Sequence, residues 1–221
     1  MMMRLWGRKS SINVQKVLWC LAELNLVEGR DFERIDAGLH FGKNRTTEFL
    51  KLNPNGLVPT LEDDKFVLWE SNTIMRYLTQ QHDKAQRFSA DLETRQYSEQ
   101  WLDWQLGSMW PTLRVAFVGL TRTPEDQRNY AVIEKSYQDT NQLLALLDQN
   151  LATRTYCAGS QFQICDIAVA LCVSRWILLN VHFPEKTGPR LPLKNIDAWM
   201  NRVETETKYS VVAEKELNIL K

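Results

Sequence analysis

Asn53-Pro54-Asn55-Gly56-Leu57-Val58-Pro59 is the stretch that decides the fold, and Leu68-Trp69-Glu70-Ser71 follows it closely. The tetrapeptide at 53–56 is a strong turn signal, because proline presets φ and glycine accepts left-handed backbone. Residues 57–61 then form a predicted strand that proline interrupts, since proline has no N–H for a ladder. A cis bond before Pro59 would turn the Val58 backbone outward toward a ligand. On the proline alone, the rarity of cis bonds favours an ordinary edge or bulge proline by about two to one.

The elements around this stretch alternate between strand and helix. Strands are predicted at 4–6, 31–35, 57–61 and 66–69. Apolar residues at helical spacing predict helices that begin near Ser11 or Asn13, at Thr46 and at Ser71. The order strand, helix, strand, short helix, strand, strand, helix predicts a small α/β unit over residues 1–82.

The remainder of the chain has a different pattern. The polar residues 83–91 are predicted to be a linker, and helical spacing dominates the residues 92–221. A long helix is expected after the start signal Thr123-Pro124-Glu125. The segment 166–179 is apolar nearly all round, which predicts a central buried helix. The second part is therefore expected to be an all-helical domain.

Composition excludes several classes of function. Lys and Arg together number 27, as do Asp and Glu, and this zero net charge argues against nucleic-acid and anionic-membrane binding. The most apolar run, 167–181, is short for a bilayer span and is interrupted by Arg175. The N-terminus lacks the apolar core of a secretory signal, so a cytoplasmic location is expected. The four cysteines form no C-x-x-C pair and the three histidines lie far apart, so no metal site is expected.

Two short motifs carry candidate chemistry. Ser11 stands before the first predicted helix, where a hydroxyl can donate to a thiolate and the helix dipole favours negative charge. Asn13 offers a side-chain N–H as an alternative donor, although both residues also suit a plain N-cap. Ser71 would cap the helix at 71, whose N–H groups can hold a carboxylate, while Glu70 can hold an ammonium group. Together Glu70 and Ser71 would grip an α-amino acid head group, but each alone is better explained as a capping serine and a solvated glutamate.

In combination these motifs resemble the glutathione transferases, over essentially the whole chain. The family's N-P-x-G-x-V-P block, with its cis proline, is similar to the segment 53–59. Its E-S pair is similar to Glu70-Ser71, and the resemblance continues through residues 76–78. The opening at 5–7 and 11–17 resembles the serine-type branches, close to phi, theta and some bacterial members. The resemblance implies a thioredoxin-like α/β domain followed by an all-helical domain.

The resemblance also implies roles for single residues. Ser11 would be the catalytic serine that stabilises the glutathione thiolate, with Asn13 replacing it or sharing its role. Val58 would pair its backbone with the cysteinyl part of glutathione. Glu70 and Ser71 would hold the γ-glutamyl end.

Elsewhere the match to the family is looser. Asn44 and Arg45 fall where the family often holds the glycyl carboxylate, in a loop of variable length. Leu57 stands where a Gln or Lys often helps to bind glutathione, which weakens that part of the site. Gln163 stands where a buried capping box usually starts with Ser or Thr, although Asp166 is retained, so altered capping is expected.

The implied activity is that of a glutathione transferase, with glutathione as cosubstrate and no metal. A thiol of pKa ~8.5 is only about 3% ionised at pH 7, and lowering the pKa to ~6.5 makes it about three-quarters thiolate. One hydrogen bond to the charged sulfur, together with the helix end, can supply the roughly 2.7 kcal/mol that this requires. The electrophile is expected to be small, apolar or halogenated, and its site should lie between the domains. The candidates for that site are Trp6, Trp104, Trp110 and Arg114.

Two alternatives stay open. One is another glutathione enzyme, namely a peroxidase, disulfide reductase, dehalogenase or isomerase, because all of these use the same activated thiol. The other is a non-catalytic binding or assembly module with this fold. The resemblance further implies a role in detoxification and a homodimer built from the helices at 73–80 and 92–109.

Overall fold

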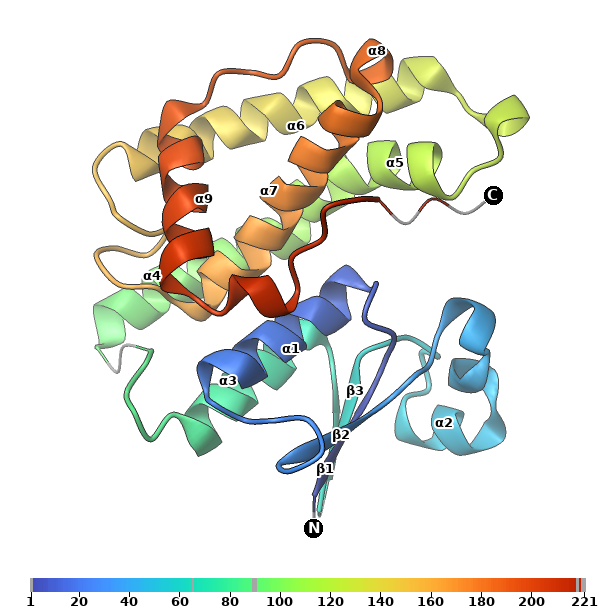
Figure 1. The fold of residues 1–221 in the computed structure, drawn as a ribbon, viewed down its shortest axis with the longest axis vertical. Coiled ribbons are helices and arrows are strands. Elements are labelled where there is room, and N and C mark those ends of the chain that lie inside the picture. The colour runs from blue at the N-terminus through green and yellow to red at the C-terminus, as the bar shows by residue number, and fades with distance from the viewer. Residues whose placement is uncertain (1, 65, 89–90, 218, 220–221) are drawn as a thin grey trace. The chain divides into compact units, whose positions relative to one another are not determined.

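In the computed structural model, residues 2–64, 66–88, 91–217 and 219 are described, and the chain divides into two compact units (Figure 1). The first unit comprises Met1–Phe88 together with Lys208–Val212. The second comprises Ser89–Thr207 and Ala213–Lys221. The predicted linker includes residues 89 and 90, which lie outside the described part of the chain.

The first unit is built on a four-stranded sheet in the order β2-β1-β3-β4. Its strands are β1 (Met3–Trp6), β2 (Phe32–Ile35), β3 (Thr60–Asp63) and β4 (Phe66–Trp69). β1 pairs with β2 in parallel and with β3 antiparallel, and β3 and β4 form an antiparallel hairpin. The predicted α/β character of this unit is confirmed.

β3 differs from the strand that the sequence predicts. It begins at Thr60, directly after Pro59, because a proline cannot donate to the ladder. The Val58–Pro59 bond is cis. The interpretation from the proline alone was therefore wrong, and the geometry implied by the family resemblance is present.

Two helices form the core of this unit with the sheet. α1 (Ile12–Glu23) and α3 (Ser71–His82) pack together through fully buried apolar side chains, including Val14, Val17, Ile74 and Leu78. A shorter helix, α2 (Thr47–Leu52), follows two 3-10 turns, η1 (Leu39–Phe41) and η2 (Lys43–Arg45). The prediction of Ser71 as an N-cap is wrong, since Glu70 occupies the cap and Ser71 is the first helical residue.

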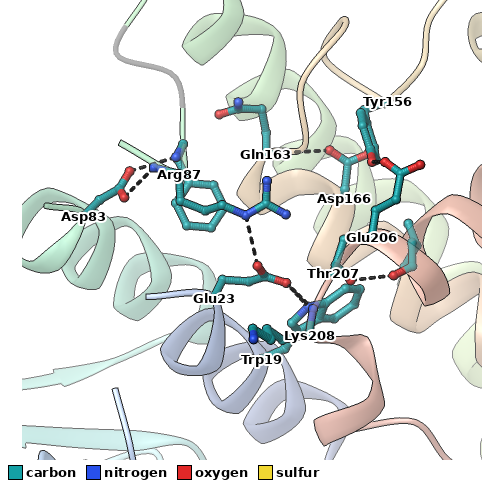
Figure 2. A network of polar contacts seen from close by, with 12 residues as sticks. Trp19, Glu23, Asp83, Arg87, Tyr156, Gln163, Asp166, Glu206, Thr207 and Lys208 are labelled. Atoms are coloured by element: carbon teal, nitrogen blue, oxygen red, sulfur yellow. Dashed lines mark hydrogen bonds and ion pairs between the residues drawn. The ribbon is translucent and has the colours of Figure 1, made fainter. Parts of the chain in front are cut away.

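The C-terminal end of α1 is held by a buried carboxylate (Figure 2). Glu23 accepts hydrogen bonds from the Trp19 indole at 2.9 Å, the Arg87 guanidinium at 3.0 Å and the Lys208 backbone N–H at 2.6 Å. The Tyr209 ring packs against Trp19 with its centroid 5.0 Å away. Residues from three distant parts of the chain thus converge on one helix end.

The described residues of the second unit form helices and the turns between them. These helices are α4 (Leu92–Trp104), α5 (Trp110–Thr121), α6 (Tyr130–Leu151), α7 (Ile164–His182), α8 (Pro184–Thr187) and α9 (Lys194–Glu206). A π-helical segment, η3 (Gln105–Met109), joins α4 to α5 with helical backbone at both junctions, so the three run as one helix. The all-helical prediction is confirmed.

The start of α6 is displaced from its predicted position. The residues Pro124 and Glu125 lead into a 3-10 turn, η4 (Glu125–Gln127). α6 begins only at Tyr130, where the Asn129 side chain accepts a hydrogen bond from the Val132 N–H. An asparagine N-cap therefore overrides the upstream proline signal.

α7 is the central helix of the second unit, as predicted. By length and composition its 19 residues suffice to cross a membrane, contrary to the expectation from residues 167–181, but 83% of its most apolar stretch is buried in the protein. Asp166 is fully buried near its start and accepts hydrogen bonds from the Cys157 N–H, the Gln163 N–H and the Trp199 indole. Figure 2 shows the bond between Gln163 and Asp166. Gln163 and Asp166 form a capping box, so glutamine fills the position usually taken by Ser or Thr.

Candidate functional site

A pocket of about 60 Å³, partly open to solvent, lies beside the cis proline of the first unit. Its lining combines amide, hydroxyl and carboxylate side chains with the backbone of the proline turn. The lining residues are Asn13, Asn53, Asn55, Leu57, Val58, Pro59, Glu70 and Ser71. Residues from the start of α1, the turn before β3 and the start of α3 are thus brought together.

Asn53 fixes the shape of the proline turn. Its Nδ2 donates to the Leu57 carbonyl at 3.0 Å and to the Thr60 hydroxyl at 3.1 Å, and its Oδ1 accepts from the Asn55 N–H at 3.0 Å. Gly56 takes a φ of 62°, which side chains disfavour. The turn is predictable from the sequence, whereas the role of Asn53 in bracing it is not.

The segment that precedes α2 is tied to the same turn and is rich in cations. Asn44 Nδ2 donates to the Gly56 carbonyl at 2.6 Å, so this amide supports the turn. Arg45 is exposed on η2, which also contains Lys43, and the His40 ring lies tilted against that of Phe41 in η1. His40 and Lys43 were missed from the sequence, although the run of basic residues around 40–45 is visible there. Positive charge at this position suits a carboxylate ligand.

Ser11 and Asn13 occupy different positions at the start of α1. Ser11 is the N-cap and is 9% exposed, and its carbonyl accepts from the Gln15 N–H at 2.8 Å. Among the described residues, no backbone N–H of the first turn of α1 caps onto the Ser11 hydroxyl. Asn13 lines the pocket itself, and its Oδ1 accepts a hydrogen bond from the Ser71 hydroxyl at 3.4 Å.

The N-terminal end of α3 forms another wall of the pocket. Glu70 is held at φ 69° before the helix, and its carbonyl accepts the first helical hydrogen bond, from the Ile74 N–H at 2.9 Å. The three N–H groups before Ile74 therefore precede the helical hydrogen-bonding pattern. They carry the positive end of the helix dipole, which favours an anion beside Ser71.

The N-terminal end of α3 also contacts a buried ammonium group, that of Lys16. Lys16 is 1% exposed, and its Nζ donates to Asn72 Oδ1 at 3.2 Å, linking α1 to α3. This cation follows Asn13 by one helical turn, and its partner follows Ser71 directly. This buried cation was not predicted, although a lysine among the apolar residues 14, 17 and 18 is an unusual pattern in a buried helix.

The predicted electrophile residues are distributed over both units. Trp6 belongs to the first unit, where its indole N–H donates to Glu62 at 2.6 Å and its ring meets Phe49 edge to face. The other three belong to the second unit. Trp104 packs edge to face on Trp101, the Trp110 ring centroid lies 5.8 Å from that of Phe117, and Arg114 is exposed on α5.

The described residues offer neither a reactive cysteine among three of the buried thiols nor a cluster of metal ligands. Burial raises the pKa of the Cys20, Cys157 and Cys165 thiols, so they remain protonated at neutral pH and are poor nucleophiles. Within the described ranges, no three His, Cys, Asp or Glu side chains lie close enough together to hold a metal ion.

Comparisons with known proteins show which proteins the chain resembles. The family model "Glutathione S-transferase, N-terminal domain" matches residues 1–80. Glutathione S-transferase GstB of Escherichia coli K12 is 42% identical over 86% of this chain and 89% of its own. Glutathione S-transferase F10 of Arabidopsis thaliana is 27% identical over 88% and 91% of the two chains.

A solved structure extends the match to three dimensions. The theta class glutathione S-transferase of Xanthomonas axonopodis pv. citri, with glutathione bound, superposes with a TM-score of 0.83 at 35% identity. The match covers 94% of this chain and 95% of that one. The thioredoxin-like plus helical architecture is therefore confirmed. With the cis-proline pocket, the Glu70-Ser71 wall and close relatives over nearly its whole length, the chain belongs to the glutathione S-transferase family.

Proposed function

We propose that the protein is a glutathione transferase that binds glutathione in the pocket beside Pro59 and activates its thiol for attack on a small electrophile. The observation that carries this proposal is the pocket itself. It unites a cis-proline turn, a helix N-terminus and a carboxylate within one unit. These are the groups needed to hold a peptide backbone, a carboxylate and an ammonium group at once.

The pocket suggests how glutathione would be oriented. The N–H groups at the start of α3 and the Ser71 hydroxyl would hold the γ-glutamyl carboxylate, and Glu70 would hold its ammonium group. The backbone of Val58 would pair with the cysteinyl residue in the manner of an added strand. The basic segment around His40, Lys43 and Arg45 would attract the glycyl carboxylate, while Asn44 supports the turn.

The activation of the thiol is assigned mainly to Asn13. Its Oδ1 faces the Ser71 hydroxyl, so the N–H₂ branch of the same amide is the one that would donate to a sulfur anion. Asn13 lines the pocket, whereas Ser11 is buried at the helix cap. Ser11 contributes from that cap, and the helix dipole and the buried Lys16 add positive potential.

The reaction itself then needs little from the protein. The thiolate sulfur forms a bond to the electrophilic carbon, and a leaving group such as halide departs with its electron pair. The thiol proton passes to solvent before attack. Catalysis thus consists of raising the thiolate fraction and orienting the nucleophile.

Calorimetric titration with glutathione, together with turnover of a chlorodinitrobenzene, tests this assignment. Glu70→Gln should weaken glutathione binding by roughly tenfold or more, because it removes a charged partner of the ammonium group. Glu33→Gln, which removes an exposed carboxylate from β2, is the matched control and should bind normally. Unchanged affinity in Glu70→Gln would contradict the assigned pocket.

We further propose a cytoplasmic homodimer that removes electrophiles, as the family resemblance implies. Exposed leucines on the predicted dimer face support this, since Leu92 is 70% and Leu106 is 51% exposed. Light scattering should give twice the chain mass of 25.8 kDa, and the mass of a single chain would overturn the dimer.

A further inference from the structure

A loop of the first unit, residues 7–11, leads from β1 to α1 and is held by the side chain of Arg34. This residue lies in β2, and its side chain is only 11% exposed. Its Nη1 donates to the carbonyl of Gly7, the first residue after β1, at 3.0 Å. Nη1 also donates to Asp36 Oδ1, and Nη2 donates to Asp36 Oδ2 at 3.4 Å. One guanidinium thus fastens a backbone carbonyl of the loop to a carboxylate that follows β2.

Two carboxylates hold this guanidinium in place. Besides Asp36, Glu28 forms an ion pair with it, with Oε1 3.6 Å from Arg34 Nε. The hydrogen bond from Arg34 lowers the pKa of Asp36, although burial opposes the shift, so Asp36 is ionised at neutral pH. Because the guanidinium is planar and its donors have a fixed geometry, these partners also fix the donor that reaches Gly7.

Gly7 connects this guanidinium to the first turn of α1. Its N–H donates to the Ile35 carbonyl at 2.8 Å, so β2 holds both polar groups of its backbone. Its other contact is with Val14, since a Cβ added at Gly7 would lie 2.3 Å from Val14 Cγ2. Val14 is fully buried and directly follows Asn13. A displacement of Gly7 would therefore be passed to the turn that carries Asn13, because such closely packed groups do not move independently.

The next residue of the loop extends the same support to Ser11. The Arg8 N–H donates to the Ala37 carbonyl at 3.2 Å, and the Arg8 carbonyl accepts from the Ser11 N–H at 3.1 Å. The segment after β2 is thus linked to Ser11 through the backbone of one loop residue. Both residues assigned to thiol activation depend on how β2 and the residues after it hold this loop.

We propose that Arg34 is a positioning residue for thiol activation, because it holds the Gly7 carbonyl and thereby the loop that presents Ser11 and Asn13. The lining of the pocket comes from α1, the proline turn and α3, whereas Arg34 lies on β2 and acts through the loop. A donor to a sulfur anion must be placed to within about 0.5 Å, which requires such support. This inference rests on the proposed transferase function.

Arg34→Met tests the role, since it removes the charge and the donors while keeping an unbranched side chain. The pKa of bound glutathione, from ultraviolet difference titration, should rise by about one unit. The kcat/KM for a chlorodinitrobenzene should fall on the order of 10- to 100-fold, because the donor is misplaced. Glutathione affinity should change less than about threefold near pH 5.5, where the thiol is mostly protonated whether free or bound.

Arg4→Met is the matched control. It breaks another arginine–carboxylate pair of the same sheet, with Glu62 at 2.9 Å, in which no residue of the loop takes part. The bound thiol should keep its wild-type pKa in this variant. Asp36→Asn is a milder second variant that weakens the hold on Arg34, and it should raise the thiol pKa by about half a unit. It decides the question if Arg34→Met does not fold.

The results that would overturn the inference differ from those that would contradict the proposed function. A thiol as acidic as in the wild type, in Arg34→Met or in Asp36→Asn, would overturn the positioning role. An equal rise in Arg4→Met would also overturn it, since the effect would then reflect a general loosening of the sheet. A bound thiol that is not acidified in the wild-type protein would instead contradict the proposed function.

Discussion

Three asparagine side chains give the pocket its form. Asn13 lines it, Asn44 holds the Gly56 carbonyl, and Asn53 joins both ends of the proline turn. Each amide offers a donor and an acceptor without net charge. The three amides therefore shape the pocket with neutral hydrogen-bonding groups, while its charge comes from other residues such as Glu70.

Tyr77 offers a test of the electrostatics of the first unit. Its hydroxyl donates to Asp63, and burial together with that carboxylate raises the pKa of Tyr77 to about 12. An unfolded tyrosine titrates near pH 10. Between these values the folded state keeps a proton that the unfolded state loses, so this contribution to stability is lost as the pH rises.

Tyr77→Phe should therefore reduce the pH dependence of unfolding between about pH 10 and 12. After allowance for solvent screening, the wild-type advantage below pH 10 should be about 1 kcal/mol or less. Urea unfolding of both proteins across this range measures it. A constant difference between the two proteins at every pH would contradict the raised pKa.

At the scale of single elements, α1 connects the candidate site to the rest of its unit. At its start lie the N-cap Ser11 and Asn13, and at its end Glu23 accepts three hydrogen bonds. The helix is thus fixed at the end opposite the pocket. Precise placement of Asn13 depends on such support.

Glu23→Ala should lower the free energy of unfolding by about 2–4 kcal/mol, because it removes the acceptor of the buried Trp19 indole N–H and of the Lys208 backbone N–H. Thermal or urea unfolding measures the loss. Glu33→Ala, at an exposed strand position, is the control and should stay within about 0.5 kcal/mol of wild type. A Glu23 variant as stable as this control would contradict the anchoring role.

The continuous helix formed by α4, η3 and α5 contains two glycines. Replacing them by alanine should change the stability of the protein in opposite directions. A Cβ added at Gly107, in the π-helical segment, meets no atom within 4 Å. A Cβ at Gly119 would lie 2.6 Å from Ile133 Cγ1 on α6.

Gly107→Ala should stabilise the protein by about 0.5–1 kcal/mol, since it removes backbone freedom from the unfolded chain. Gly119→Ala should destabilise it by about 1–3 kcal/mol through overpacking. Melting temperatures of the two variants give the comparison. Equal effects of the same sign would contradict the close packing of Gly119 against Ile133.

Over the whole molecule, periodicity predicted most elements, because helices and strands depend on neighbouring residues. It predicted the α/β unit, the helical unit and the buried α7. It misplaced the start of β3 and α6, where a proline without a partner and an asparagine cap decided the boundary. The cis bond before Pro59 became predictable only from the whole 53–59 block, since a single proline does not specify its isomer.

Contacts between distant segments could not be predicted from local patterns. Glu23 meets Lys208, which is 185 positions away, and Arg175 meets Glu214. The C-terminal residues Lys208–Val212 therefore pack with the first unit, although the chain order places them after the helical part. Roles such as those of Asn53 and Lys16 depend on hydrogen-bond geometry, which residue spacing does not contain.

The central claim concerns the ionisation of bound glutathione, and ultraviolet difference titration of its thiolate tests it most directly. In the wild-type protein the thiol pKa should lie about two units below the free value of ~8.5. Asn13→Ala should raise it most of the way back, Ser11→Ala should raise it less, and the double variant should restore the free value. A bound thiol that titrates at its free value in the wild type, or that stays acidic in the double variant, would contradict the account.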